Sequence, residues 1–529
     1  MHARNARQRV HGLISLCPMR RKHESLLDEA HRGEARGMTS GIRRKAGFLA
    51  GAGLLEYALQ MALPVILVRY LTKQEFGDYR LMWLVATTGL ILFPLFLPQS
   101  LFYFLPRAAP GTRPKLVGNT FVSLFALGGL AILLLLVLMP VLPGSIAGLQ
   151  RHSPLVQIFA GTWILASILD VLPNADGRAE WQACATVVLA TLRLAALSGL
   201  AVASGDVGWV LVAMCGVAMV KVGIALGYAL FAAQETGLGF DGGLARLQLN
   251  YSLPFAVAQG LFALRVQADQ WIVAANFSNT AFALISIASM VLLVGGLIRQ
   301  PLNNALLPNI SSLLGEGKLD DACALIQKGY LVLGLMLPPV LGLLISTADE
   351  LVEVIYTREY LGAVPLMRIY LLGQVATVFA AGHLLQVFRF GGQAAMIGAI
   401  SLVASIALSI LGLQFFGLGG AVAGSTTSLV LLECWALNKV AKALQTSIAQ
   451  MIRLDQTWRV IVVVAVGVLV VHVLCSGLDA SVFLRLFVKS LVFVIAVLLG
   501  LALTNMHRSL LSFLPERDQR RKHDPLSTR

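Results

Sequence analysis

Long hydrophobic runs, separated by short polar segments, follow one another along most of the chain. Each run is long enough for a helix to cross a bilayer, which takes roughly 20 mostly apolar residues. The pattern predicts an all-α, polytopic membrane protein with about 14 transmembrane helices. The predicted spans lie at about 46–71, 79–105, 116–142, 154–173, 180–204, 207–233, 249–276, 281–307, 329–347, 362–388, 392–415, 417–440, 458–475 and 481–504.

The composition agrees with a membrane protein. Of the 529 residues, 57% are hydrophobic and 13% are charged, whereas about 25% of the residues of a soluble domain are charged. The six cysteines are scattered without the spacing of a zinc site or a disulfide framework. We therefore expect neither a metal nor another cofactor.

The net charge of +14 comes mostly from Lys and Arg in the tails and in the short segments between spans. This placement indicates topology signals and attraction to anionic membrane lipids rather than nucleic-acid binding. The segments that share a side with the two termini carry more Lys and Arg than the opposite segments, so we expect both termini in the cytoplasm. The longest opposite segment covers only about 348–361.

A weak internal repeat divides the predicted spans into two groups. Residues 69–85 align with 275–291 at a shift of 206, which pairs Thr72 with Ser278 and maps the first span onto the seventh. Transporters often have such a plan, so we expect two six-helix lobes and a terminal helix pair. The expected segments are a basic, disordered cytoplasmic extension at 1–45, an N-terminal lobe at 46–233, a cytoplasmic linker at 234–248, a C-terminal lobe at 249–440, a cytoplasmic linker at 441–457, the helix pair at 458–504 and a basic cytoplasmic tail at 505–529.

Two segments resemble a known family. VRYLTKQEFGDYRL (68–81) and LPFAVAQGLFALRVQADQWIVAANFS (253–278) are similar to the polysaccharide-biosynthesis (Wzx-type O-antigen flippase) family of the multidrug/oligosaccharidyl-lipid/polysaccharide exporter superfamily. The resemblance implies two six-helix bundles around a central cavity that opens alternately to each side. It also implies export of an undecaprenyl-diphosphate-linked oligosaccharide across the bacterial inner membrane, with membrane lipids and other polysaccharide-assembly proteins as further partners.

Two charged residues interrupt the seventh predicted span. Arg265 and Asp269 lie one turn apart, on one narrow helix face with Tyr251, Phe262 and Asn276. A charge at this depth costs about 3 kcal/mol on insertion scales. One interpretation is a structural ion pair that fixes helix packing. The other is that both line a cavity, where Arg265 meets an anionic substrate and Asp269 serves as its partner or as a cation site.

The other deep ionisable residues are mostly basic. Arg193, Lys221 and Arg299 fall within the fifth, sixth and eighth spans. They suit a diphosphate or acidic sugars, and contacts between lobes or with lipid headgroups are the alternative. Glu56, one turn from Gln60 on the first span, is a candidate for proton or sodium coupling, or a protonated group bonded to a neighbouring helix.

Further candidates concern proton relay and bending. His383 and Gln386 on the tenth span form a candidate proton relay, although a packed histidine is the commoner case. Prolines in the first two spans of each expected lobe would permit bending during transport. These prolines are Pro64, Pro94, Pro98, Pro254 and Pro301.

Several motifs of catalytic proteins are absent from the sequence. The chain has no GxxxxGK[ST] loop, no HExxH and no GxSxG, so we expect a transporter rather than an enzyme, and one without its own ATP site. A drug/cation antiporter and a lipid II flippase of the same superfamily are alternatives, and the basic bias disfavours the antiporter. A membrane polymerase or ligase of glycan assembly is disfavoured by the short external segments.

The expected topology can be tested with side-sensitive reporters. A reporter fused after residue 529 should be active in the cytoplasm, and one inserted at 476–480 should be active outside, because the two positions are separated by one predicted span. Finding both reporters on the same side would contradict the predicted number of spans.

Overall fold

The computed structural model describes residues 47–49, 51–141, 149–233, 237–388 and 391–504. Within these ranges the regular structure is helical and no β-strand is present. The prediction of an all-α fold is therefore confirmed. The expected extension at 1–45 and the tail at 505–529 lie outside the described residues.

The described part contains ten helices that are long and apolar enough to cross a membrane, or eleven if α3 and the bent segment after it form one span. The protein is thus a multi-pass membrane protein, while the figure of about 14 spans stays a prediction. Helix α11 (Gly242–Asn276) is not among the ten, and neither is the pair α16 (Val364–Ala376) and α17 (Gly382–Val387). Helix α18 (Gly391–Ala443) turns at Gly417, whose φ of 59° favours glycine.

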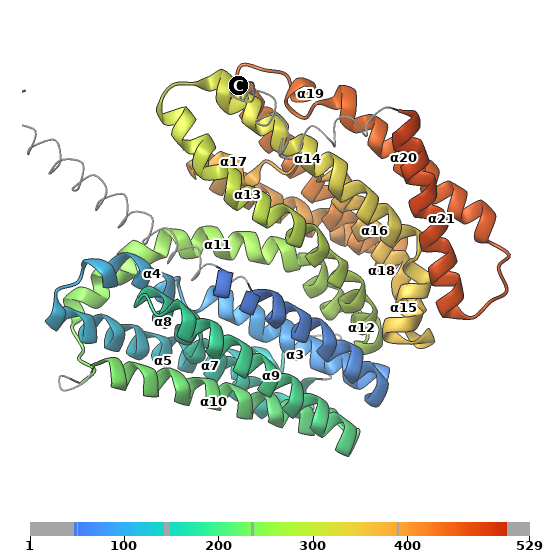
Figure 1. Cartoon of the computed structure of the whole chain (residues 1–529). Helices are drawn as coiled ribbons and strands as arrows, with labels where there is room; N and C mark the ends of the chain where they lie inside the picture. Colours follow the sequence, from blue (N-terminus) through green and yellow to red (C-terminus); the bar gives the residue numbers. More distant parts are fainter. Residues whose placement is uncertain (1–46, 50, 142–148, 234–236, 389–390, 505–529) are drawn as a thin grey trace, which may run out of the picture.

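The helices form two groups with α11 between them (Figure 1). One group holds the helix Gly47–Tyr70, α3 (Lys73–Leu92), α4 (Leu97–Phe104), α5 (Arg113–Leu138), α7 (Ser153–Ala166), α8 (Leu172–Ala175), α9 (Ala179–Ser204) and α10 (Val207–Ala233). The other holds α12 (Asn279–Ala288), α13 (Leu292–Gly315), α14 (Leu319–Ser346), α15 (Ala348–Tyr356), α16, α17, α18, α19 (Ile448–Met451), α20 (Leu454–Cys475) and α21 (Val482–Leu503). We call them the N-terminal and the C-terminal bundle. Helix α11 packs on α3, α4 and α5 of the first and on α18 of the second.

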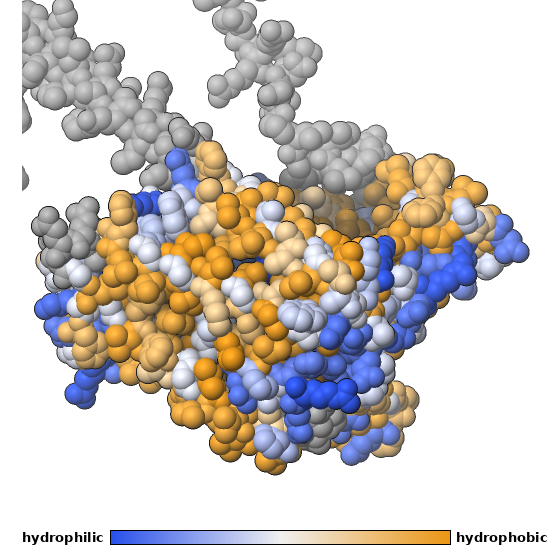
Figure 2. Space-filling view, turned by 90° about the horizontal axis from the view of Figure 1, so that it is seen from below, coloured by the Kyte–Doolittle hydropathy of each residue, from blue (hydrophilic) through white to orange (hydrophobic). Residues whose placement is uncertain are grey.

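Much of the surface is apolar, as expected for a protein in lipid. In the face shown in Figure 2, hydrophobic residues cover large areas of the left and the upper middle, and hydrophilic residues gather in the lower middle and on the right. The segment expected as the longest external loop is itself folded, because α15 and a 3-10 helix at Arg358–Ala363 occupy it.

The two segments of the repeat have the same local structure. Thr72 caps α3 and Ser278 caps α12, and each side-chain oxygen accepts a hydrogen bond from the backbone three residues further on. Phe76 and Phe282, four residues after these caps, are both fully buried. The repeat therefore begins two equivalent helices.

Helices α3 and α12 pack directly on each other, which joins the two bundles. A Cβ atom on Gly77 would lie 2.1 Å from the carbonyl oxygen of Asn279, so only glycine permits this approach. Asn279 also donates a hydrogen bond to Asp78, and Arg80 Nε donates one to Ser286 Oγ at 3.1 Å. We call this contact between α3 and α12 the seam.

The bends predicted from proline are present in part. Helix α3 stops before Pro94, and the chain continues into α4 after a bend of 40°, with Leu95 and Phe96 at positive φ. Pro254 and Pro301 lie inside α11 and α13, which continue through them.

The seam can be tested with two glycines of the same helix. Gly77→Ala should destabilise the protein by about 1–3 kcal/mol, because the added methyl group overlaps the backbone of α12. Gly89→Ala is the matched control, since its Cβ would meet only Ile164 at 3.9 Å. It should leave stability unchanged or slightly raised. Thermal unfolding in detergent measures both, and equal stability of the two variants would contradict the close packing.

Candidate functional site

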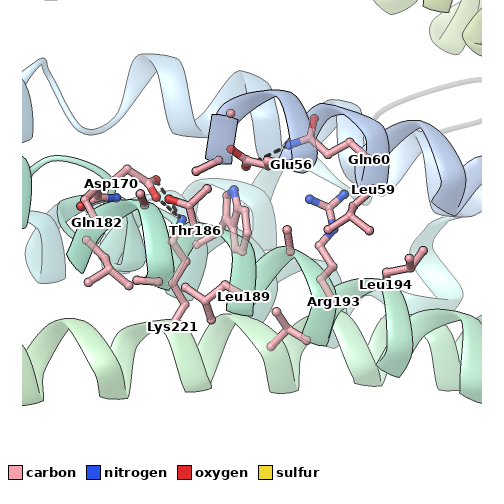
Figure 3. A pocket seen from close by; sticks show the side chains of 18 of the residues that line it. Glu56, Leu59, Gln60, Asp170, Gln182, Thr186, Leu189, Arg193, Leu194 and Lys221 are labelled. Carbon is pink, nitrogen blue, oxygen red and sulfur yellow. Dashed lines mark hydrogen bonds and ion pairs between the residues drawn. The ribbon is translucent and has the colours of Figure 1, made fainter. Parts of the chain in front are cut away.

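A cavity of about 430 Å³ lies inside the N-terminal bundle. The helix Gly47–Tyr70 closes one side of it, and α9 and α10 lie opposite (Figure 3). Three of the predicted site residues, Glu56, Arg193 and Lys221, line this one cavity. The other charged, amide and tryptophan residues of the lining are Gln60, Trp83, Trp163, Asp170, Asn174 and Gln182.

Lys221 is held by an ion pair. Its Nζ lies 2.8 Å from each carboxylate oxygen of Asp170 and 4.5 Å from the ring centroid of Trp163. The residue is 8% exposed. Asp170 therefore neutralises the charge of Lys221, which the sequence did not predict because the two residues are 51 positions apart.

Arg193 has no such partner. Its Cζ atom lies 4.1 Å from the ring centroid of Trp83, so the guanidinium stacks on the indole. It makes no hydrogen bond or ion pair with any described residue, and its Nε is buried without a partner. In Figure 3 the guanidinium points towards the helix that carries Glu56 and Gln60. No described residue therefore occupies its terminal Nη donors.

Glu56 lies on the opposite wall and is bonded within its own helix. Gln60 Nε2 donates a hydrogen bond to Glu56 Oε1 at 3.1 Å. The cavity therefore combines two carboxylates with two cations, of which one carboxylate and one cation form the ion pair. Indole rings of Trp83 and Trp163, 5.8 Å apart, provide its aromatic wall.

Arg265 and Asp269 are buried in α11, outside this cavity, with exposures of 5% and 2%. The expected ion pair between them is not formed. Asp269 instead accepts hydrogen bonds from Tyr370 Oη at 2.5 Å and from the backbone of Gln270 at 2.8 Å, so a tyrosine from α16 takes the place expected for the arginine. Arg265 contacts the ring of Phe262, and its Nε is buried without a partner.

Arg299 supports a broken helix. It donates hydrogen bonds to the carbonyl oxygen of Thr377 at 3.1 Å, to the amide oxygen of Gln374 at 3.4 Å and to Gly295. Thr377 is the first residue after α16, where the helix stops before resuming as α17. A Cβ atom on Gly295 would overlap the side-chain amide of Gln374, so glycine leaves room for that amide.

Glu433 completes the support of this break and was not predicted as a site residue. Its Oε2 accepts a hydrogen bond from the backbone of Ala381 at 2.8 Å, just before α17 begins. Non-helical backbone at membrane depth needs such partners. His383 of α17 is exposed, and the side chain of its expected partner Gln386 lies outside the described residues.

Contacts at one end of the molecule also join the bundles. Arg69 Nη2 donates a hydrogen bond to the carbonyl oxygen of Val354 at 3.1 Å, and Lys73 Nζ lies 5.5 Å from the ring centroid of Tyr360. Figure 1 shows the start of α3 close to α12 and α15 at this end. The seam is therefore part of a wider closed interface.

Comparison with known proteins gives the family. Residues 66–365 match the family model described as polysaccharide biosynthesis protein, which covers more than half of the chain. The chain belongs to this polysaccharide biosynthesis protein family. No curated protein matches the sequence. The family predicted from the sequence is thereby confirmed.

Solved structures of transporters have the same fold. The lipid II flippase MurJ in an inward closed conformation has a TM-score of 0.67 and 12% identity, covering 88% of this chain and 99% of its own. An inward-facing multidrug resistance MATE family transporter has a TM-score of 0.56 and 12% identity, and the match covers 74% of this chain and 95% of that chain. A transporter of the MOP superfamily from Pyrococcus furiosus, described by the reverse polarity of its binding pocket, has a TM-score of 0.53 and 10% identity. The match covers 76% of this chain and 96% of that chain. The predicted MATE-like fold is confirmed.

The support of the broken helix can be tested with two arginines. Arg299→Ala removes three hydrogen bonds and leaves the carbonyl of Thr377 without its donor, so unfolding should become easier by about 1–3 kcal/mol. Arg358→Ala is the control, because the side chain of Arg358 is 80% exposed and forms an ion pair with Glu353, and such surface pairs contribute about 0–1 kcal/mol. If the two variants unfold at the same temperature in detergent, Arg299 does not have this supporting role.

Proposed function

We propose that the protein is a flippase that moves an undecaprenyl-diphosphate-linked oligosaccharide, the repeat unit of an O-antigen, capsule or exopolysaccharide, across the bacterial inner membrane. The family and the transporter fold support this proposal. The observation that carries it is the pair of arginines, Arg193 and Arg265, whose buried Nε atoms have no partner inside the membrane-spanning helices.

An arginine with open donors is costly in a membrane. Charged side chains there normally pair with one another, with backbone carbonyls or with water. Lys221 and Arg299 follow this rule, whereas Arg193 and Arg265 contact only aromatic rings. A guanidinium matches phosphate and carboxylate oxygens with two parallel hydrogen bonds. Arg193 and Arg265 therefore bind the anionic groups of the substrate.

The remaining predicted residues assist these two. Arg299 adds positive charge close to the substrate path while its donors are held by backbone and amide oxygens, and Lys221, neutralised by Asp170, shapes the cavity of Arg193. Asp269, fixed by Tyr370, shapes the surroundings of Arg265. Glu56 is the proposed ion-coupling group, because it faces the cavity of Arg193 and its hydrogen-bonded partner is the neutral Gln60.

Transport proceeds by alternating access between the two bundles. The seam and the contacts of Arg69 and Lys73 close one end of the molecule. With both termini in the cytoplasm, as the basic residues indicate, this closed end is external. The described conformation is then closed to the outside, and export requires the seam to separate. The lobes at 46–233 and 249–440, with the helix pair at 458–504, are the proposed moving units.

Reconstituted transport tests the proposal. Purified protein in liposomes should move a fluorescent undecaprenyl-diphosphate oligosaccharide between leaflets without any nucleotide, because the sequence contains no P-loop. Arg265→Gln should lower the rate by about tenfold or more, and Arg265→Lys should retain part of it since the charge remains but the planar fork is lost.

The matched control is Arg453→Gln. Arg453 forms only a loose ion pair, at 3.7 Å, with Asp455 at the start of α20, so transport should continue at the normal rate. Strict dependence on ATP, or equal transport by the Arg265 and Arg453 variants, would refute the proposal. Transport of organic cations instead of the lipid-linked glycan would indicate a drug antiporter.

A further inference from the structure

We infer that the cavity of the N-terminal bundle binds one carboxylate, carried by an acidic sugar of the glycan, on the guanidinium of Arg193. The inference rests on the proposed function and narrows its substrate to glycans that contain a sugar acid. It also assigns the two arginines different anions, since the diphosphate would then be bound in the region of Arg265.

The free donors single out Arg193 among the cations of the cavity. Lys221 has both oxygens of Asp170 within 2.8 Å, so an incoming anion would have to displace a carboxylate already bound there. Arg193 rests on the face of Trp83 and makes no polar contact with the described residues. Stacking on an indole orients the guanidinium, and Arg193 lines the cavity with Nη donors that no described residue occupies, whereas its Nε is buried.

The charge balance favours a group with one negative charge. With Lys221 paired to Asp170, the positive charge of Arg193 has no ion-pair partner among the described residues, and Glu56 is hydrogen-bonded to Gln60 on the opposite wall. One carboxylate is balanced by this charge. A diphosphate carries more negative charge, and the carboxylates of Glu56 and Asp170 on the cavity wall would oppose the excess. The planar guanidinium also fits a planar carboxylate through two parallel hydrogen bonds.

The rest of the lining suits a sugar ring. Gln182 is 6% exposed, and its Oε1 is buried without a partner although the residue lines the cavity. An unpaired buried acceptor is costly and is satisfied by a hydroxyl donor. Figure 3 places Gln182 and Arg193 towards opposite sides of the cavity. A ligand between them therefore has a carboxylate on one side and hydroxyl groups on the other, which describes a sugar acid.

The volume agrees with such a ligand. Pockets for small molecules measure about 300–1,000 Å³, mostly apolar with a few convergent polar groups. The cavity has about 430 Å³, with two tryptophans and several aliphatic side chains between its polar ends. It accommodates a single residue of a glycan rather than a whole repeat unit.

Binding of small probes tests the inference. Methyl β-D-glucuronide and methyl β-D-glucoside differ only in the carboxylate, and calorimetry with the full chain in lipid nanodiscs measures their affinities. The glucuronide should bind about tenfold or more tightly than the glucoside. Arg193→Gln should remove this difference, and Arg193→Lys should restore part of it. Gln182→Leu should weaken both probes by a similar factor, because it removes only a hydroxyl acceptor.

The paired exchange Lys221→Gln with Asp170→Asn is the discriminating control, because it removes the ion pair without changing the net charge of the cavity. It should reduce glucuronide affinity much less than Arg193→Gln does. An equal reduction would place the carboxylate on Lys221 and overturn the inference. Tighter binding of inorganic pyrophosphate than of the glucuronide, or equal binding of the two glycosides, would overturn it as well.

The same preparations separate this inference from the proposed function. If the probes behave as expected but the liposome assay shows no movement of a lipid-linked glycan, the carboxylate site stands and the flippase function fails. In the opposite case, the protein moves lipid-linked glycans, and the Arg193→Gln variant moves both acidic and neutral glycans as fast as the unchanged protein does. The flippase function then stands, and the inferred carboxylate site fails.

Discussion

The cost of a charge inside the membrane is the constraint that organises this protein. For most of the deep charges this cost is lowered by a partner from another segment of the chain. Lys221 pairs with Asp170, Asp269 accepts a hydrogen bond from Tyr370, and Arg299 donates to the carbonyl oxygen of Thr377 at a helix break. Two arginines, Arg193 and Arg265, have no such polar partner among the described residues. They lie in different parts of the fold, one in the N-terminal bundle and one in α11, so the substrate would meet positive charge at two separate places.

The contact between α3 and α12 relates the two bundles to each other. Equivalent positions of the repeat meet there, since Arg80 and Ser286 are 206 residues apart and hydrogen-bonded. The glycine at 77 brings the two backbones into contact, and the buried Asp78 is bonded to Asn279. The seam thus combines these polar contacts with buried apolar side chains, among them Phe76 and Phe282.

The sequence predicted the fold class and the family, because hydrophobic runs and short family segments are local features. It could not show which charges meet. Asp170 lies 51 positions from Lys221 and pairs with it. Tyr370, 101 positions from Asp269, donates the hydrogen bond to Asp269 for which Arg265 was a candidate. The break between α16 and α17 was missed because no proline or charge marks it. It depends on Arg299 and Glu433 from other helices.

We expect substrate anions to occupy Arg193 and Arg265, and a structure with bound substrate is the sharpest test of this expectation. Electron cryo-microscopy of the protein in nanodiscs with an acidic undecaprenyl-diphosphate oligosaccharide should show ligand density within hydrogen-bonding distance of Arg193 and of Arg265. Density for the glycan along other surfaces, with both guanidinium groups contacting only water or protein, would contradict the account.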